Sequence, residues 1–170
     1  MTRTVAPTRT SSCACGRVRC RATGAPIISL VCYCDDCQEA ARRIEALPDA
    51  AGFREADGGT ALLTYRDDRF SCTAGEELLA DCKLSEAAPT RRVVASCCNS
   101  AMFLKYAPGF WVSAYRARFE GDLPRLEMRI QTRHRQADSP LPRDLPSHRG
   151  FPIKLYARII AARAAMMLGR

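Results

Sequence analysis

Short stretches in which small or apolar residues alternate with polar ones run through much of the chain. Residues 16–22 alternate in this way with three arginines, which predicts a half-exposed strand with Val18 and Cys20 facing inward. Residues 60–65, 78–84, 92–95 and 126–130 predict further strands, and short apolar runs occupy residues 26–31, 101–104 and 110–114. The chain is therefore predicted to be mainly β.

Two segments show helical periodicity instead. Residues 39–47 are helix formers with Ala40, Ile44 and Leu47 at helical spacing, which predicts a short helix that ends before the next proline. From Phe151 onward a C-terminal amphipathic helix is predicted. Its apolar face holds Tyr156, Ile159, Ile160, Ala164 and Met167. This face packs on the domain's own sheet in one interpretation, and binds a membrane surface or a partner in the other.

The chain is expected to fold around a single core. Its 170 residues with 47% hydrophobic content suffice for one domain. We expect a loose N-terminal tail over residues 1–11, a domain over residues 12–118, and a basic extension over residues 119–170 that packs on or flanks it. The sequence contains no run of eighteen apolar residues, so no membrane span is expected. The first residues also lack the apolar stretch of a secretory signal. A cytoplasmic protein is therefore expected.

The formal net charge of +8 is concentrated at the C-terminal end. Residues 125–170 hold ten lysines and arginines against three acidic residues, which gives +7 and leaves +1 for residues 1–124. This basic C-terminal part could bind an anionic partner. A basic face that is simply exposed to solvent would show the same excess of arginine and lysine.

The ten cysteines carry the most chemical information. Thiols stay reduced in the cytosol, so metal binding is a better interpretation than a disulfide framework. Two groups stand out, a C-x-C pair at Cys13 and Cys15 and a C-Y-C-D-D-C run at Cys32, Cys34 and Cys37.

The C-Y-C-D-D-C run predicts an open metal site. Cys32 and Cys34 share one face of an extended backbone, and Cys37 reaches the same point after a short turn. Zinc held by three protein ligands keeps a fourth position for water or substrate, whereas a structural site is closed by four.

A third group, Cys97 and Cys98, follows a predicted strand. Further ligands must come from here if Cys13 and Cys15 belong to a closed structural site. Adjacent strand residues point to opposite faces, so both cysteines can serve one ion only where the backbone turns. A redox sensor or thiol carrier that uses this pair is an alternative.

The order of these motifs resembles the glutathione-dependent formaldehyde-activating enzyme family, which also includes centromere protein V. The matching run, over about residues 12–112, is Cys13-x-Cys15-Gly16-x-Val18, then Gly24-x-Pro26, then Cys32-x-Cys34-x-x-Cys37, then a late cysteine before an apolar strand. The resemblance implies a β-tent of antiparallel sheets and about two zinc ions per chain. One zinc would be structural, held by Cys13, Cys15 and the late Cys97 and Cys98, and the other would be held by Cys32, Cys34 and Cys37.

Four positions depart from the family pattern. Tyr33 replaces a histidine and Gln38 an arginine beside the three-cysteine run, so these two residues are candidates for orienting a substrate. Ala95 stands in place of the first late cysteine, and Asn99 in place of a glycine.

The resemblance also implies a carbon–sulfur lyase that forms or cleaves thiol–aldehyde adducts such as S-hydroxymethylglutathione. Its partners would be a small thiol such as glutathione and an aldehyde. The alternative is a zinc-stabilised binding module whose arginine-rich C-terminus contacts nucleic acid or another anion.

Overall fold

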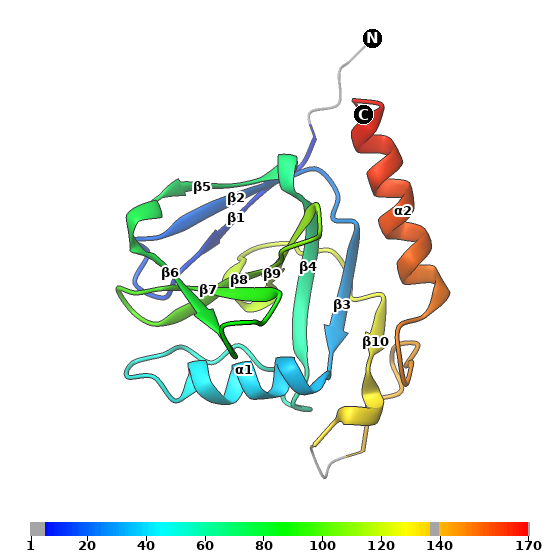
Figure 1. Cartoon of the computed structure of the whole chain (residues 1–170), viewed down its shortest axis with the longest axis horizontal. Coiled ribbons are helices and arrows are strands. Elements are labelled where there is room, and N and C mark those ends of the chain that lie inside the picture. Colours follow the sequence, from blue (N-terminus) through cyan, green and yellow to red (C-terminus); the bar gives the residue numbers. More distant parts are fainter. Residues whose placement is uncertain (1–5, 137–139, 170) are drawn as a thin grey trace.

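A computed structural model describes residues 6–136 and 140–169, and within them ten strands form two sheets (Figure 1). The smaller sheet has the order β1 (Thr8–Ser12), β2 (Arg19–Thr23), β5 (Phe70–Ala74). The larger sheet has the order β10 (Met128–Ile130), β3 (Ile28–Cys32), β4 (Thr60–Arg66), β9 (Trp111–Tyr115), β8 (Ser100–Tyr106), β7 (Thr90–Ala95), β6 (Leu79–Lys83). The structure confirms the mainly β prediction.

All the pairings are antiparallel except that of β10 with β3. In this parallel pair Met128 lies opposite Leu30, and Ile130 lies opposite Cys32. The C-terminal part of the chain thus adds a strand to the sheet beside the C-Y-C-D-D-C run.

Two α-helices flank the larger sheet, α1 (Asp35–Glu45) and α2 (Ile153–Met167). Figure 1 shows α1 across the ends of the strands and α2 alongside β3. The described residues also form short 3₁₀ helices, at Asp67–Arg69, Glu76–Leu78, Arg116–Arg118 and Thr132–His134. None of the helices described is long and apolar enough to cross a membrane.

Helix α1 begins four residues earlier than the predicted range 39–47. Asp35 and Asp36 occupy its first turn, and Arg42 and Arg43 its last turn. Both pairs complement the helix macrodipole, which favours a helix that starts directly after Cys34 and includes Cys37.

Helix α2 contacts the sheet with only part of its apolar surface. Leu155 is buried, and Ile159 packs against the main core cluster. Ile160 and Met167, predicted on the same apolar face, are 68% and 77% exposed.

The predicted loose tail over residues 1–11 is wrong from Thr8 onward, because β1 pairs with β2 along its whole length. Strand β1 is polar and its ladder of backbone hydrogen bonds holds it, so apolar alternation could not reveal it. Residues 1–5 of the predicted tail lie outside the described residues.

Strand β4 lies at the centre of the core and is buried along its whole length. Leu63 and Tyr65 face the smaller sheet, where they join a cluster with Ala22 of β2. Leu62 faces the other way, into a cluster with Ile44 of α1, Leu155 of α2 and other residues. The larger sheet therefore has the smaller sheet on one face and the helices on the other, and the helix-covered face carries the C-Y-C-D-D-C run.

Candidate metal centres and an adjoining cavity

The four cysteines predicted to form a structural site converge on one point. Their sulfurs all lie within 4.8 Å of one another. The Sγ of Cys15 is 3.5 Å from that of Cys13 and 3.3 Å from that of Cys97, and the Sγ of Cys97 is 3.9 Å from that of Cys98. Tetrahedral zinc with bonds of about 2.3 Å places its sulfurs about 3.8 Å apart. This spacing fits one zinc ion with four ligands.

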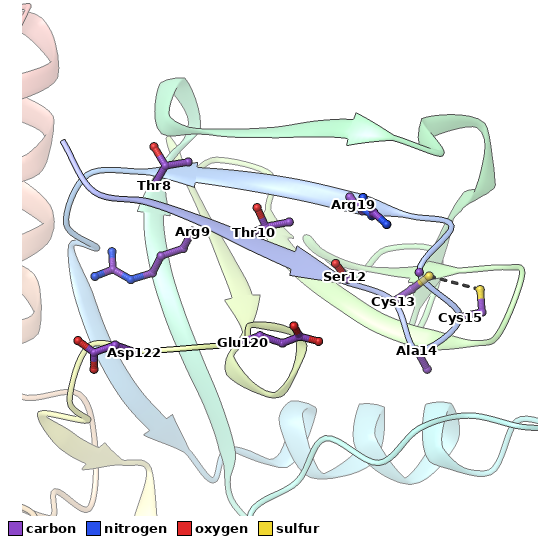
Figure 2. Close-up of a pocket in the computed structure, with 11 residues that line it drawn as sticks. Thr8, Arg9, Thr10, Ser12, Cys13, Ala14, Cys15, Arg19, Glu120 and Asp122 are labelled. Carbon is purple, nitrogen blue, oxygen red and sulfur yellow. Dashed lines mark hydrogen bonds between the residues drawn. The ribbon is translucent and has the colours of Figure 1, made fainter. Parts of the chain in front are cut away.

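A tight turn between β1 and β2 presents the first two sulfurs, as Figure 2 shows for Cys13 and Cys15. Gly16 has a φ of +76°, which favours glycine, and its N–H donates to the carbonyl of Cys13 at 2.9 Å. The N–H of Val18 donates to the Sγ of Cys13 at 3.2 Å. The C-x-C-G sequence therefore forms a loop in which a backbone donor already faces a sulfur.

A second turn, between β7 and β8, presents Cys97 and Cys98. The turn ends at Asn99 with a φ of +51°, which asparagine adopts more readily than most residues, so asparagine replaces the family's glycine at small cost. The backbone thus turns where two adjacent cysteines need it to. The Ser100 hydroxyl accepts a hydrogen bond from the N–H of Ala14 at 2.9 Å and joins the two turns.

The local polar groups favour ionisation of Cys98. Burial opposes the charged form, but hydrogen bonds with Ser100 and with Cys15 outweigh it and lower the pKa of Cys98 to about 6.

The C-Y-C-D-D-C run forms the second group, with its three sulfurs within 4.8 Å of one another. Cys32 is the last residue of β3, Cys34 is the N-cap of α1, and Cys37 lies in the first helical turn. The N–H of Cys37 donates to the carbonyl of Cys34 at 2.9 Å. The strand-to-helix junction therefore gathers three thiols at a helix N-terminus, where negative charge is favoured.

The three thiols hold one negative charge most readily on Cys34. Hydrogen bonds with Cys32 and Cys37 lower the pKa of Cys34 to about 3. The hydrogen bond with Cys34 raises the pKa of Cys32 to about 12, and hydrogen bonds with Cys32 and Cys34 raise that of Cys37. A divalent cation would let all three ionise, and sulfur-only ligand sets suit zinc, so both cysteine groups fit that metal.

The two residues predicted to orient a substrate, Tyr33 and Gln38, make hydrogen bonds within the chain. Tyr33 is fully buried, its hydroxyl donates to Asp57 at 2.7 Å, and Arg129 donates to it at 3.1 Å. The Gln38 side chain donates to the carbonyl of Gly58 at 3.1 Å. Both side chains hold the loop before β4 and do not line the cavity described next.

A cavity of about 570 Å³ adjoins the three-cysteine group. Cys32, Cys34 and Cys37 all line it, and Cys34 is the most exposed of the three. Its apolar lining includes Leu30, Leu62, Leu104, Trp111, Leu155 and Ile159. Ligand sites commonly have this size and apolar character.

Arg92 of β7 also lines this cavity and is only 2% exposed. Its Nη2 donates to the carbonyl of Asp36 at 3.1 Å, while its Nε and Nη1 lack a hydrogen-bond partner among the described residues. Its positive charge favours the thiolate of Cys34. Sequence reasoning missed this residue, because Arg91 and Arg92 are adjacent and only the fold decides which one faces inward.

A separate hollow of about 640 Å³ runs along β1 beside the four-cysteine group (Figure 2). Its lining is polar and carries both signs of charge, from Arg9, Arg19, Glu120 and Asp122. The four-sulfur group at its end has no position left for a ligand once a tetrahedral ion is bound, so the three-cysteine cavity is the stronger candidate for chemistry.

Comparison with known proteins places these motifs in one family. Residues 8–111, which contain both cysteine groups, match the sequence model of the glutathione-dependent formaldehyde-activating enzyme family. A search of curated proteins found no match. Among solved structures, a crystal structure of a Rhodobacter sphaeroides protein is similar with 16% sequence identity, covering 68% of this chain and 91% of that chain, with a TM-score of 0.48. Because the match to the family spans more than half of the chain, the chain belongs to the glutathione-dependent formaldehyde-activating enzyme family.

Proposed function

We propose that the protein is a carbon–sulfur lyase that forms or cleaves thiol–aldehyde adducts such as S-hydroxymethylglutathione. The observation that carries this proposal is the group of three cysteines, with no fourth cysteine, histidine or carboxylate gathered around it in the described part of the chain, beside a cavity of ligand size. Membership of the family supports the same reaction class.

Cys32, Cys34 and Cys37 are the proposed ligands of a zinc ion at this cavity. Bound there, zinc supplies an open coordination position and a positive charge that favours the thiolate form of a thiol substrate. The chain's own contribution is to hold thiol and carbonyl together in an apolar space with little water.

Formation and cleavage of the thiol–aldehyde adduct need no oxidant, reductant or further co-reactant. In the direction of synthesis the thiol proton leaves, the sulfur attacks the carbonyl carbon, and the carbonyl π electrons move to oxygen, which takes up a proton. Cleavage is the reverse: the hydroxyl proton leaves, the carbon–sulfur bond breaks, and its electrons return to sulfur. Proton exchange with water is sufficient for both directions.

We assign a structural role to a second zinc at Cys13, Cys15, Cys97 and Cys98. Four sulfurs complete a tetrahedron and leave no position for substrate. This ion would link the β1–β2 turn to the β7–β8 turn.

The alternative, a binding module for nucleic acid, has less support. Several arginines of the basic C-terminal part are engaged within the chain, because Arg129 pairs with Asp144 at 2.8 Å and Arg158 pairs with Glu127 at 3.0 Å. These ion pairs reduce the positive charge available to phosphates, and salt-dependent binding of DNA or RNA is accordingly not expected.

Exchange spectroscopy tests the proposed reaction. Nuclear magnetic resonance with ¹³C-formaldehyde measures the rate of exchange between the free aldehyde and its thiol adduct. Two thiols are compared, glutathione and 6-mercaptohexanoate. The zinc-loaded protein should accelerate exchange for at least one thiol. Cys34→Ser should abolish the acceleration, and Cys72→Ser, outside both cysteine groups, should retain it. No acceleration by the wild-type protein, or equal rates with Cys34→Ser, would refute the proposal.

A further inference from the structure

The cavity floor is one row of cross-strand neighbours on the helix-covered face of the larger sheet. Ile28 pairs with Thr64, Thr64 with Ser113, Ser113 with Leu104, and Leu104 with Arg92. The hydroxyls of Thr64 and Ser113 bond to each other at 3.0 Å. Arg92 is therefore the one cation in this row, its neighbour Leu104 is apolar, and the two hydroxyls further along the row are paired with each other.

The walls of the cavity are mainly apolar, although one threonine, two tyrosines and an aspartate also line them. Leu30 and Leu62 come from the strands near the cysteines, Trp111 comes from β9, and Leu155 and Ile159 come from α2. Such walls remove water from a ligand and offer few hydrogen bonds in return, so they favour an apolar ligand body over a peptide.

Arg92 lacks a full set of partners in this setting. A buried cation without hydrogen-bonded partners is costly. The nearest carboxylate, that of Asp36, lies 4.0 Å from Nη2, and its side chain is 69% exposed. The Nε and Nη1 donors are left for an anionic oxygen that enters the cavity.

We propose that the cavity binds an apolar carboxylic acid, with its carboxylate on Arg92 and its chain against the aliphatic walls. Given the proposed lyase function, on which this identification of the substrate rests, the substrate class is an aliphatic thiol acid or its aldehyde adduct. Glutathione fits less well, because its two peptide amides lose hydration against the apolar walls.

Calorimetric titration of the zinc-loaded protein tests the inference. The probes are 6-mercaptohexanoate, its carboxamide, hexanoate, hexanamide and glutathione. A charge-assisted hydrogen bond in a buried site contributes about 10- to 100-fold in affinity. Each acid should therefore bind at least tenfold more tightly than its amide, and 6-mercaptohexanoate more tightly than glutathione.

Substitutions locate the preference. Arg92→Met should make acid and amide bind alike, whereas Arg92→Lys should keep part of the difference. The matched control is Arg91→Met on the same strand, where the side chain is 49% exposed and pairs with Asp81, and it should keep the full difference. Zinc content is measured for each variant, so that loss of the metal is not mistaken for loss of the arginine contact. The comparison of acid with amide on the wild-type protein tests the inference even if a variant fails to fold.

The outcomes separate this inference from the lyase proposal. Equal binding of acid and amide to the wild-type protein, tighter binding of glutathione, or an acid preference that survives Arg92→Met would overturn it. The last result would indicate that the carboxylate binds the metal. Acid preference at Arg92 without adduct exchange for any thiol would refute the lyase proposal and leave the carboxylate site in place.

Discussion

Replacing Cys15 with serine should destabilise the whole protein far more than replacing Cys34. Cys15 is exposed, so the substitution removes a sulfur ligand with little loss of packing. The four-cysteine group joins turns that are distant in sequence, since Cys13 and Cys97 are 84 residues apart. The three-cysteine group joins residues only five positions apart, Cys32 and Cys37.

These separations set the expected magnitudes through the entropy of the unfolded chain. A cross-link that closes a loop of about 84 residues contributes about 4.5 kcal/mol, and one that closes a loop of about six residues contributes roughly 2 kcal/mol. Loss of the cross-link over the longer loop would remove about a third or more of the stability of a typical domain. That stability is about 5–15 kcal/mol. For a chain of this size the loss corresponds to a fall in Tm of about 9–18 °C.

Urea unfolding of the zinc-loaded proteins in reducing buffer without chelator measures both values. Zinc-loaded wild type, Cys15→Ser and Cys34→Ser are compared, with Cys72→Ser as the control cysteine, and zinc content is determined for each. We expect a loss of about 4–5 kcal/mol for Cys15→Ser and about 2 kcal/mol or less for Cys34→Ser. Equal losses, or an unchanged Cys15→Ser, would refute the assignment of the structural ion.

Three further predictions concern thiol reactivity, close packing and the role of the tyrosine. In the metal-free reduced chain, iodoacetamide should label Cys34 and Cys98 faster than the other ligand cysteines. Labelling of Cys98 should fall as the pH drops through about 6, its pKa. Labelling of Cys34 should persist at that pH, because the pKa of Cys34 is about 3. Peptide mapping that finds the other ligand cysteines faster would contradict this. A Cβ at Gly59 would lie 2.8 Å from the Tyr33 ring, so Gly59→Ala should cost about 1–3 kcal/mol in thermal unfolding, with Gly150→Ala close to neutral because its site is open. Tyr33→Phe should lower the free energy of unfolding by about 1–3 kcal/mol and leave the adduct exchange rate unchanged. A slower exchange with normal stability would instead support the substrate-orienting role.

Much of the larger sheet could be predicted from the sequence, because its strands are apolar on the faces they bury. In the smaller sheet, Cys20 of β2 and the preceding Val18 face inward as predicted and are fully buried. Residues 60–65, 78–84 and 92–95 form β4, β6 and β7, and the apolar runs form β3, β8 and β9. Strands β1 and β5 were not predicted, since residues such as Thr8–Ser12 are held by backbone pairing.

The candidate site could be predicted in part. Each cysteine group is a local motif, and the need for a turn at Cys97 followed from strand geometry. The partner of the C-x-C pair lies more than eighty residues away, so its position rested on the family resemblance. Arg92 could not be predicted, because a shift in strand register between Val93 and Val94 breaks the alternation that would assign its face.

A zinc count combined with an anomalous difference map of crystals grown in reducing buffer tests the central claim most directly. The account predicts two ions per chain. One should have four sulfur ligands from Cys13, Cys15, Cys97 and Cys98, and the other should have Cys32, Cys34 and Cys37 with its fourth position open to the cavity. A single ion, or a fourth protein ligand at the three-cysteine group, would contradict the account.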